Sequence, residues 1–423
     1  VATLPGDVHH IGKALLMSVL SACGYAVVDL GSQVPVETIV DATIRLQPDA
    51  LGLSALLVST SKQMPICIQR LDARGVRVPV LIGGAAINRA FGRASGVLPG
   101  GRAYAAGVFY CKDVFEGLAA LDALVDPAER TAFVARTLDE IRAEAVRPAS
   151  SDPVKPREVK RGGPRQDIPV PRPPYWGARQ VAVDLRDVWR HLDRNTLFRY
   201  HWGGYRLPPD DLQRLIRDDF EPRLAALSED GRRDGWLQPL IVSGYFACQA
   251  DGDSLVIYAS PDSQTILTRL DFPRQPDGEQ LCLADYFRAR DSGERDVVAL
   301  QAVTTGPRAG EYIDELLGEG RYARMQYVSG LAAATAEALA EHAHQLARRD
   351  LGLASGRGLR FSWGYPACPD LEEQRKVLPL LRAERVIGLT LSESNNLDPE
   401  HSTAAIIVHH PEAKYFAVRG GAA

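Results

Sequence analysis

The chain has 423 residues, with 49 Lys and Arg against 53 Asp and Glu, and its formal net charge is -4. This length allows two or three domains with separate cores, and the near-balance of charge argues against a nucleic-acid partner, which needs a basic face. Hydrophobic residues make up 45% of the chain, which excludes global disorder, and no apolar run approaches the ~20 residues of a membrane-spanning helix.

Six cysteines are spread along the chain without a CxxC pair. This spacing fits neither a disulfide framework nor a structural zinc site, so we expect reduced thiols and a cytoplasmic protein. The chain begins with Val1 and has no basic-then-apolar leader, which indicates a piece of a longer protein. We also expect a monomer.

Residues 1–124 alternate short apolar runs with helical patterns such as Ile11–Ser21 and Val36–Leu46. Apolar runs separated by helices are typical of a parallel sheet covered on both faces. The sequence therefore predicts an α/β domain with a flavodoxin-like doubly wound parallel sheet, whose ligand lies at the carboxyl ends of the strands. The expected strands are Val1–Leu4, Ala26–Leu30, Ala50–Leu53, Val80–Ile82 and Ala103–Ala106.

Residues 125–177 hold a predicted helix, Ala128–Val146, and a stretch rich in Pro and Arg from Arg147 to Pro174. Such a stretch predicts an interdomain linker, with binding to an anionic partner as the alternative. Residues 178–423 predict an α+β domain with an antiparallel sheet. Its expected helices are Leu212–Leu227, Glu311–Leu317 and Arg321–Arg349, and its expected strands are Leu240–Gln249, Ser254–Tyr258, Asp296–Val303, Ala404–Val408 and Tyr415–Val418.

The loop after the first strand contains the pattern Asp-x-His-x-x-Gly, formed by Asp7, His9 and Gly12. A neutral imidazole binds a metal through one ring nitrogen while the other donates to a carboxylate. His9 and Asp7 are therefore a candidate metal ligand and its hydrogen-bond partner, and Gly12 allows a bulky ligand to approach. The alternative is an aspartate that caps a helix beside an incidental histidine pair.

Small and hydroxyl-bearing residues follow the later strands, with Ser54, Ser59 and Thr60 after the third, and Gly83 and Gly84 after the fourth. At one edge of a sheet these residues would open a deep slot for a long ligand arm. With the Asp-x-His-x-x-Gly pattern, they make residues 1–124 resemble a cobalamin-binding domain.

This resemblance implies that the nucleotide base of cobalamin enters the slot and that His9 binds cobalt as the lower axial ligand. Asp7 and the hydroxyl of Thr60 would extend the hydrogen-bond chain and couple the release of His9 from cobalt to protonation. His10 stands where the family often has an acidic residue. The implied contacts with the cofactor are Gly6, Asp7, Val8, His9, His10, Gly12, Ser54, Thr60, Gly83 and Gly84.

The segment Arg360–Asp370 holds two prolines, a glycine and aromatic residues. These residues predict a rigid, irregular loop that clamps a ligand, or a surface loop with a packing role. The segment resembles the Arg-x-x-x-Gly-Tyr-Pro-Ala-Cys-Pro signature of the reactivation domain of cobalamin-dependent methionine synthases. The resemblance continues in Thr390–Ser394, Ser402–Ala405 and His409–Val418, and Leu192–Phe198 resembles the opening motif of that domain.

The second resemblance implies that residues 178–423 bind S-adenosylmethionine. Arg360 would donate to its carboxylate, and Asp193 would accept from its amine. The backbone of Tyr365–Ala367 would line the adenine, and Tyr415 would form an aromatic wall. Phe416 stands where a second tyrosine can occur, so one hydroxyl contact is absent.

Three further side chains leave two interpretations open. Glu337 and Glu341 lie one turn apart on the longest predicted helix. They either form a solvated helix face or form an acidic patch that holds His9 after it leaves cobalt. Trp202 either lines the cofactor face or is a buried structural aromatic.

Together the resemblances imply the carboxyl-terminal half of a cobalamin-dependent methionine synthase. In that family cobalt passes a methyl group from methyltetrahydrofolate to homocysteine. Inactive cob(II)alamin is returned to methylcobalamin by an electron from a flavodoxin-type donor and a methyl group from S-adenosylmethionine. We find no homocysteine or folate module, so this portion is expected to carry cobalamin and remethylate it. The competing readings are a corrinoid carrier or cobalamin-sensing module whose second domain only docks proteins, and a different corrinoid methyltransferase.

Overall fold

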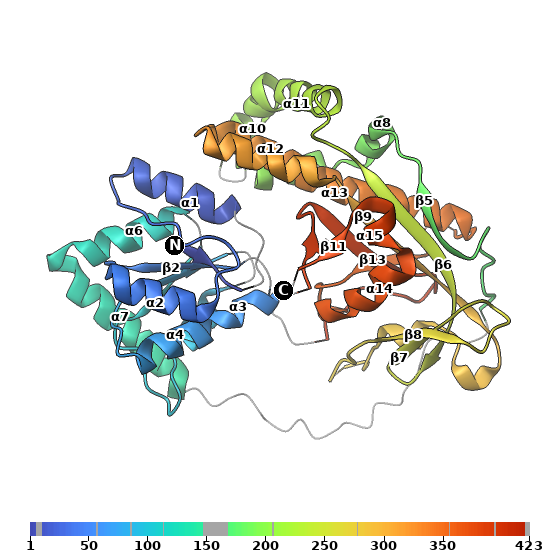
Figure 1. The fold of residues 1–423 in the computed structure, drawn as a ribbon, viewed down its shortest axis with the longest axis horizontal. Coiled ribbons are helices and arrows are strands. Elements are labelled where there is room, and N and C mark those ends of the chain that lie inside the picture. Colours follow the sequence, from blue (N-terminus) through green and yellow to red (C-terminus); the bar gives the residue numbers. More distant parts are fainter. Residues whose placement is uncertain are drawn as a thin grey trace. The chain divides into compact units, whose positions relative to one another are not determined.

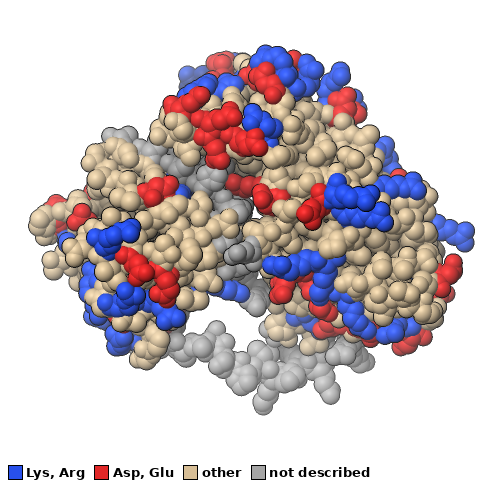
Figure 2. Space-filling model, in the orientation of Figure 1, with Lys and Arg blue, Asp and Glu red and all other residues tan. Residues whose placement is uncertain are grey.

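The computed structural model describes residues 1–5, 11–55, 58–84, 87–112, 114–146, 168–204, 207–276, 278–354, 356–392 and 395–418. The chain divides into two compact units, Val1–Arg157 and Glu158–Ala423 (Figure 1). On the face drawn in Figure 2, basic and acidic side chains are interspersed over both units. In the described ranges, no helix combines the length and the apolar character needed to cross a membrane.

The described strands of the first unit form a four-stranded parallel sheet in the order β1-β2-β3-β4. Each strand is followed by at least one helix, as parallel pairing requires. The elements are β1 (Ala2–Thr3), α1 (Ile11–Ala22), α2 (Val36–Leu46), β2 (Leu51–Ser54), α3 (Val58–Ser61), α4 (Gln63–Ala73), β3 (Val80–Gly83), α5 (Arg89–Ser95), β4 (Val108–Cys111), α6 (Val114–Val125) and α7 (Pro127–Val146).

Helices cover both faces of this sheet, because successive residues of a strand point to opposite faces. Ile82 of β3 packs in one core with Ile39 of α2 and Ile68 of α4. Its neighbour Leu81 packs in a second core with Leu124 of α6. The prediction of a doubly wound parallel sheet is confirmed.

Two predicted strands of this unit are wrong. Residues Ala26–Leu30 run beside β1, and the amide of Leu30 donates to the carbonyl of Val1 at 2.9 Å, but β1 is too short to extend a ladder to them. Residues Ala103–Ala106 form a turn, and the last strand begins after Gly107, whose φ is +85°. The strand β4 therefore lies five residues later in the chain than predicted.

The second unit contains an antiparallel sheet, as predicted, with seven strands in the described residues. β11 and β12 form a separate two-stranded pair. The elements are β5 (Gly177–Val181), α8 (Leu185–Val188), α9 (Arg194–Thr196), η2 (Leu197–His201), α10 (Pro209–Leu215), η4 (Ile216–Phe220), α11 (Glu221–Arg233), β6 (Leu240–Asp251), β7 (Ser254–Tyr258), β8 (Ile266–Asp271), β9 (Asp296–Thr304), α12 (Pro307–Gly318), α13 (Tyr322–Asp350), β10 (Leu359–Ser362), α14 (Gln374–Leu381), α15 (Ala383–Ile387), β11 (Thr390–Leu391), β12 (Leu397–Asp398) and β13 (Ser402–Val408).

The central strands β6 and β9 are buried on both faces. Val242 of β6 packs in a core with Val377 of α14, whereas its neighbour Ile241 packs with Leu339 of α13. The sheet is therefore the middle of three layers, with α13 on one face and α14 and α15 on the other. Along one edge of β6, the first half of the strand pairs with β5 and the second half pairs with β7.

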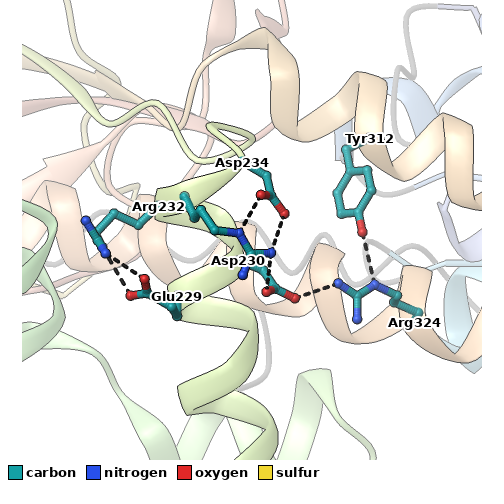
Figure 3. Close-up of polar contacts among 7 residues, drawn as sticks. Glu229, Asp230, Arg232, Asp234, Tyr312 and Arg324 are labelled. Atoms are coloured by element: carbon teal, nitrogen blue, oxygen red, sulfur yellow. Dashed lines mark hydrogen bonds and ion pairs between the residues drawn. The ribbon is translucent and has the colours of Figure 1, made fainter.

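Polar contacts join α11, α12 and α13 (Figure 3). Arg324 of α13 donates to the hydroxyl of Tyr312 on α12 at 3.0 Å and to Asp230 of α11 at 2.8 Å. Arg233 also donates to Asp230 and to Asp234. This network ties the beginning of α13 to two other helices.

The predicted helix Leu212–Leu227 is confirmed, since α10, η4 and α11 follow one another without a break, with a π-helical turn in η4 ahead of Pro222. One further expectation about the second unit is wrong. The predicted strand Tyr415–Val418 is irregular, and its last residue bonds to a loop instead of to a strand. All six cysteines are free thiols, and of these only Cys23 is exposed.

Candidate functional site

A cavity of about 540 Å³ in the first unit runs along β2 and reaches the carboxyl ends of β2 and β3. Three predicted site residues, Ser54, Gly83 and Gly84, line it together with apolar side chains of α1 and α6. The predicted residues Gly6, Asp7, Val8, His9 and His10 lie outside the described residues. Gly12 lies in the first turn of α1, and Thr60 is buried in α3.

Two glycines let backbone segments pack closely at this end of the sheet. Gly84 has a φ of +129°, and a Cβ added to it would lie 1.9 Å from the carbonyl oxygen of Ala55. A Cβ added to Gly83 would lie 3.1 Å from the carbonyl oxygen of Cys111. Only glycine fits at position 84 without moving the backbone. Glycine at these two positions therefore allows neighbouring backbone segments to approach each other in the wall of the cavity.

The cavity also contains residues that the sequence analysis missed. Leu16 and Leu20 line it from α1, one turn apart, and this spacing was the available signal. Tyr25 lines it as well and donates to Asp122 at 2.5 Å. Burial, together with that hydrogen bond, raises the pKa of Tyr25 to about 12, so the phenol stays protonated.

Arg360 lies on β10 in the second unit and has a side chain that is only 18% exposed. Its Nη2 donates to Glu337 of α13 at 3.1 Å. Its Nη1 is buried and has no hydrogen-bond partner among the described residues. A buried guanidinium nitrogen without an acceptor is costly, so it fits a ligand that brings a carboxylate.

The loop after β10 is held by its own backbone. Gly364 has a φ of +89°, and its amide donates to the carbonyl of Cys368 at 2.9 Å. The amide of Cys368 donates back to the carbonyl of Tyr365 at 3.0 Å. These bonds leave the Tyr365 side chain 58% exposed while Ala367 is buried. Burial of its hydroxyl region raises the pKa of Tyr365, and the charge of Glu337 adds to this effect.

The end of the described chain packs beside this loop. The amide of Val418 donates to the carbonyl of Pro366 at 3.1 Å. The ring of Tyr415 lies 5.2 Å from the ring of Phe361 on β10, yet the Tyr415 side chain is 67% exposed. Phe416 lies farther from Phe361, at 6.4 Å. Arg360, the loop and Tyr415 thus come together at the β10 edge of the sheet.

Asp193 makes local hydrogen bonds at the start of α9. It accepts from the amide of Thr196 at 3.0 Å and from the Thr196 hydroxyl at 2.6 Å. The two bonds lower the pKa of Asp193, so the carboxylate is ionised at neutral pH. The described hydrogen bonds of this residue do not connect it to Arg360.

The two glutamates of α13 have different partners. Glu337 pairs with Arg360, whereas Glu341 bonds to His344 at 3.2 Å and to Gln345 at 2.6 Å. The bond to His344 is the main cause that lowers the pKa of Glu341 to about 2. His201, which the sequence analysis missed, is half-buried. Burial lowers the pKa of its imidazole, and this effect outweighs the charge of Glu337, which acts to raise it.

Trp202 is buried, with 4% of its side chain exposed. Its Nε1 donates to the carbonyl of Tyr327 at 3.1 Å, and its ring packs against Phe198 and Phe220. These contacts favour the structural interpretation of this aromatic residue over a cofactor wall.

Family models match both units. Residues 1–109 match the B12 binding domain, and residues 224–420 match the activation domain of vitamin B12 dependent methionine synthase. The chain therefore joins a cobalamin-binding domain to a methionine synthase activation domain. This pair of domains is the one inferred from the sequence motifs, and the resemblance to cobalamin-dependent methionine synthase is confirmed.

Curated relatives carry the name of the particular enzyme. The chain is 34% identical to methionine synthase of Mycobacterium tuberculosis (strain ATCC 25618 / H37Rv) and 33% identical to that of Mycobacterium leprae (strain TN). Both matches cover 99% of this chain but only 38% of the relative's length. A crystal structure of the MetH reactivation domain bound to AdoHcy is similar over 59% of this chain and 84% of that chain, with a TM-score of 0.51 and 25% identity.

Proposed function

We propose that the first unit carries cobalamin and that the second unit supplies S-adenosylmethionine for its reductive remethylation. One observation carries this proposal: the buried Nη1 of Arg360 has no acceptor among the described residues and lies in a methionine synthase activation domain. The AdoHcy in the similar reactivation-domain structure supports a ligand of this class.

In the first unit, His9 would hold the cobalt of cobalamin through one ring nitrogen, and Asp7 would accept a hydrogen bond from the other ring N–H. Thr60 would extend this chain through its buried hydroxyl. When bound, cobalamin supplies a cobalt centre that accepts and gives up a methyl group. The remaining assigned contacts are those with main-chain atoms and small side chains at Gly6, Val8, His10, Gly12, Ser54, Gly83 and Gly84.

In the second unit, Arg360 would hold the ligand carboxylate through its unpaired Nη1 while Glu337 keeps the guanidinium in place. Asp193, which is already ionised, would accept from the ligand amine. The exposed rings of Tyr365 and Tyr415 would flank the adenosine and the sulfonium, since aromatic faces attract cations. Ala367 would line the adenine through its backbone, with Phe416 beside it.

The chain spans 38% of the length of its curated relatives, so the activity of the whole protein is part of the proposal. In the complete protein, other modules would bring methyltetrahydrofolate and homocysteine to the same cobalt. A flavodoxin-type protein would supply the electron for remethylation. Six free thiols support a reducing, cytoplasmic location.

The test is to load the chain with cob(II)alamin, add a low-potential reductant, and record visible spectra with and without S-adenosylmethionine. We expect methylcobalamin to form only when S-adenosylmethionine is present. The Arg360→Ala variant should bind cobalamin normally and fail to methylate it at a low concentration of S-adenosylmethionine.

Cobalamin binding without methylation in the unsubstituted chain would contradict the remethylation role and favour a corrinoid carrier whose second unit docks proteins. Absence of cobalamin binding would contradict the assignment of His9. We also expect no methionine from homocysteine and methyltetrahydrofolate with this chain alone, and turnover would refute the need for other modules.

A further inference from the structure

A second cavity, of about 330 Å³, lies in the first unit, away from the strand ends described above. It is lined by residues of β4, α5, α6 and α7. Among the described strands β4 pairs only with β3, and α7 contacts both α5 and α6. Helices, instead of another strand, therefore enclose the space beside this outermost strand.

Three arginines and two glutamates line this cavity. Arg93 forms an ion pair with Glu140 at 3.0 Å, and the carboxylate of Glu116 accepts from the amide of Lys112 at 2.9 Å. Arg89 and Arg136 have no carboxylate partner in the described part of the chain. With three guanidinium groups against two carboxylates, the lining has a net charge of +1, and the guanidinium groups of Arg89 and Arg136 remain able to donate.

Aromatic rings support both of these arginines. The guanidinium carbon of Arg136 lies 5.4 Å from the centre of the Phe133 ring, and that of Arg89 lies 6.0 Å from the Tyr110 ring. Phe133 itself stacks on Phe109 with a centroid distance of 4.9 Å. Such contacts restrict a guanidinium while leaving its N–H edges available for a second group.

We propose that this cavity binds a small dianion, a phosphate group or a short dicarboxylate, between Arg89 and Arg136. Forked guanidinium donors match the paired oxygens of such groups. The volume lies at the lower end of the range of small-ligand sites, so it excludes a molecule as large as a corrinoid. This site is independent of the function proposed above, since its residues belong to neither candidate cofactor site.

The test is calorimetric titration of the full chain with inorganic phosphate and, separately, with succinate, at constant ionic strength. We expect saturable binding of at least one dianion at millimolar concentration. Arg89→Gln and Arg136→Gln should each weaken that binding about tenfold, as loss of one charged hydrogen-bond donor does. Arg130→Gln, on the same helix as Arg136 but outside the lining, is the matched control and should change binding less than about twofold.

Ala119→Glu is a second test of anion binding in this cavity. Ala119 is an exposed lining residue of α6, so the substitution can bring a carboxylate beside the arginines without altering the core. It should abolish binding while the circular dichroism spectrum stays unchanged. Binding of phosphate alone or of succinate alone would support the site and identify its ligand chemistry. No saturable binding of either anion, or an equal loss in Arg130→Gln, would overturn the proposal.

Discussion

The two units build their candidate cofactor sites in different ways. In the first unit the site lies along parallel strands, and glycines such as Gly84 let backbone segments pack closely in its wall. In the second unit the site lies at the edge of an antiparallel sheet, where Arg360 and a loop with its own backbone bonds supply the contacts. A substitution at the first site should therefore damage the fold, whereas a substitution at the second should damage binding.

The chain allows this difference to be measured directly, because all five tryptophans lie in the second unit. Tryptophan fluorescence reports the unfolding of that unit alone, whereas far-ultraviolet circular dichroism reports both. The tryptophans are Trp176, Trp189, Trp202, Trp236 and Trp363.

The largest effect is expected for Gly84→Ala. The added methyl group would overlap the carbonyl of Ala55 and force alanine into a φ of +129°, so the first unit should lose about 3 kcal/mol of unfolding free energy. The unfolding transition of the first unit should move in circular dichroism, while the transition seen by tryptophan fluorescence should stay in place. Gly75→Ala is the control, since its φ is +72° but nothing lies within 4 Å of the added methyl group; it should lose about 1 kcal/mol. Equal losses in both variants would show that the close approach at Gly84 has no cost.

Arg360→Ala should have the next largest effect, on binding and not on folding. Loss of a forked, charged donor should weaken S-adenosylmethionine binding about 100-fold, as measured by calorimetry. The fluorescence-detected unfolding midpoint should hardly change. Arg308→Ala, which removes an exposed ion pair with Glu311 on α12, is the control and should leave binding unchanged. Unaltered affinity in Arg360→Ala would remove this residue from the site.

Glu341 should give the second unit a pH-dependent contribution to stability. Its pKa falls from 4.5 unfolded to about 2 folded, so the stabilisation is present above about pH 4.5 and is lost as the pH falls toward 2. Because the side chain is 36% exposed, we expect only about 1 kcal/mol. Denaturant unfolding followed by fluorescence should show Glu341→Gln less stable at pH 6, with the difference vanishing near pH 2. Glu384→Gln is the control, because Glu384 is an exposed glutamate in the first turn of α15. A difference that is constant with pH, or one shared by this control, would contradict the assignment.

The smallest effect is expected for Lys414→Ala. Lys414 pairs with Glu279 at 2.6 Å, but both side chains are at least half exposed. Removal of an exposed ion pair should cost less than about 0.5 kcal/mol of unfolding free energy. A loss above about 1 kcal/mol in the fluorescence-detected transition would mean that the segment preceding Tyr415 depends on this contact.

The sequence predicted the first unit well because parallel sheets follow a simple alternation. The strand pattern around Val80–Gly83 and the small residues after it were sufficient to locate the sheet and the end that opens into the cavity. The predicted strand Ala26–Leu30 was wrong because β1 has only two residues, which cannot hold Ala26–Leu30 in a ladder. Pairing length depends on tertiary context, which local periodicity does not contain.

The second unit was less predictable at the level of contacts. The loop after Arg360 was recognised from its motif, but its pairing with Glu337 joins residues of a strand and a helix that periodicity treats separately. The irregular course of Tyr415–Val418 depends on one bond to Pro366, and no local pattern encodes it. The ligand roles of these residues remain predictions.

The distribution of thiols provides a single labelling site from which a distance between the two units can be measured. Cys23 is exposed and lies in the first unit, whereas the other five cysteines are buried. A maleimide dye should therefore label that position selectively under native conditions. Energy transfer from the tryptophans of the second unit to a dye on Cys23 would then report changes in the separation of the two units when cobalamin or S-adenosylmethionine is added, without any engineered residue.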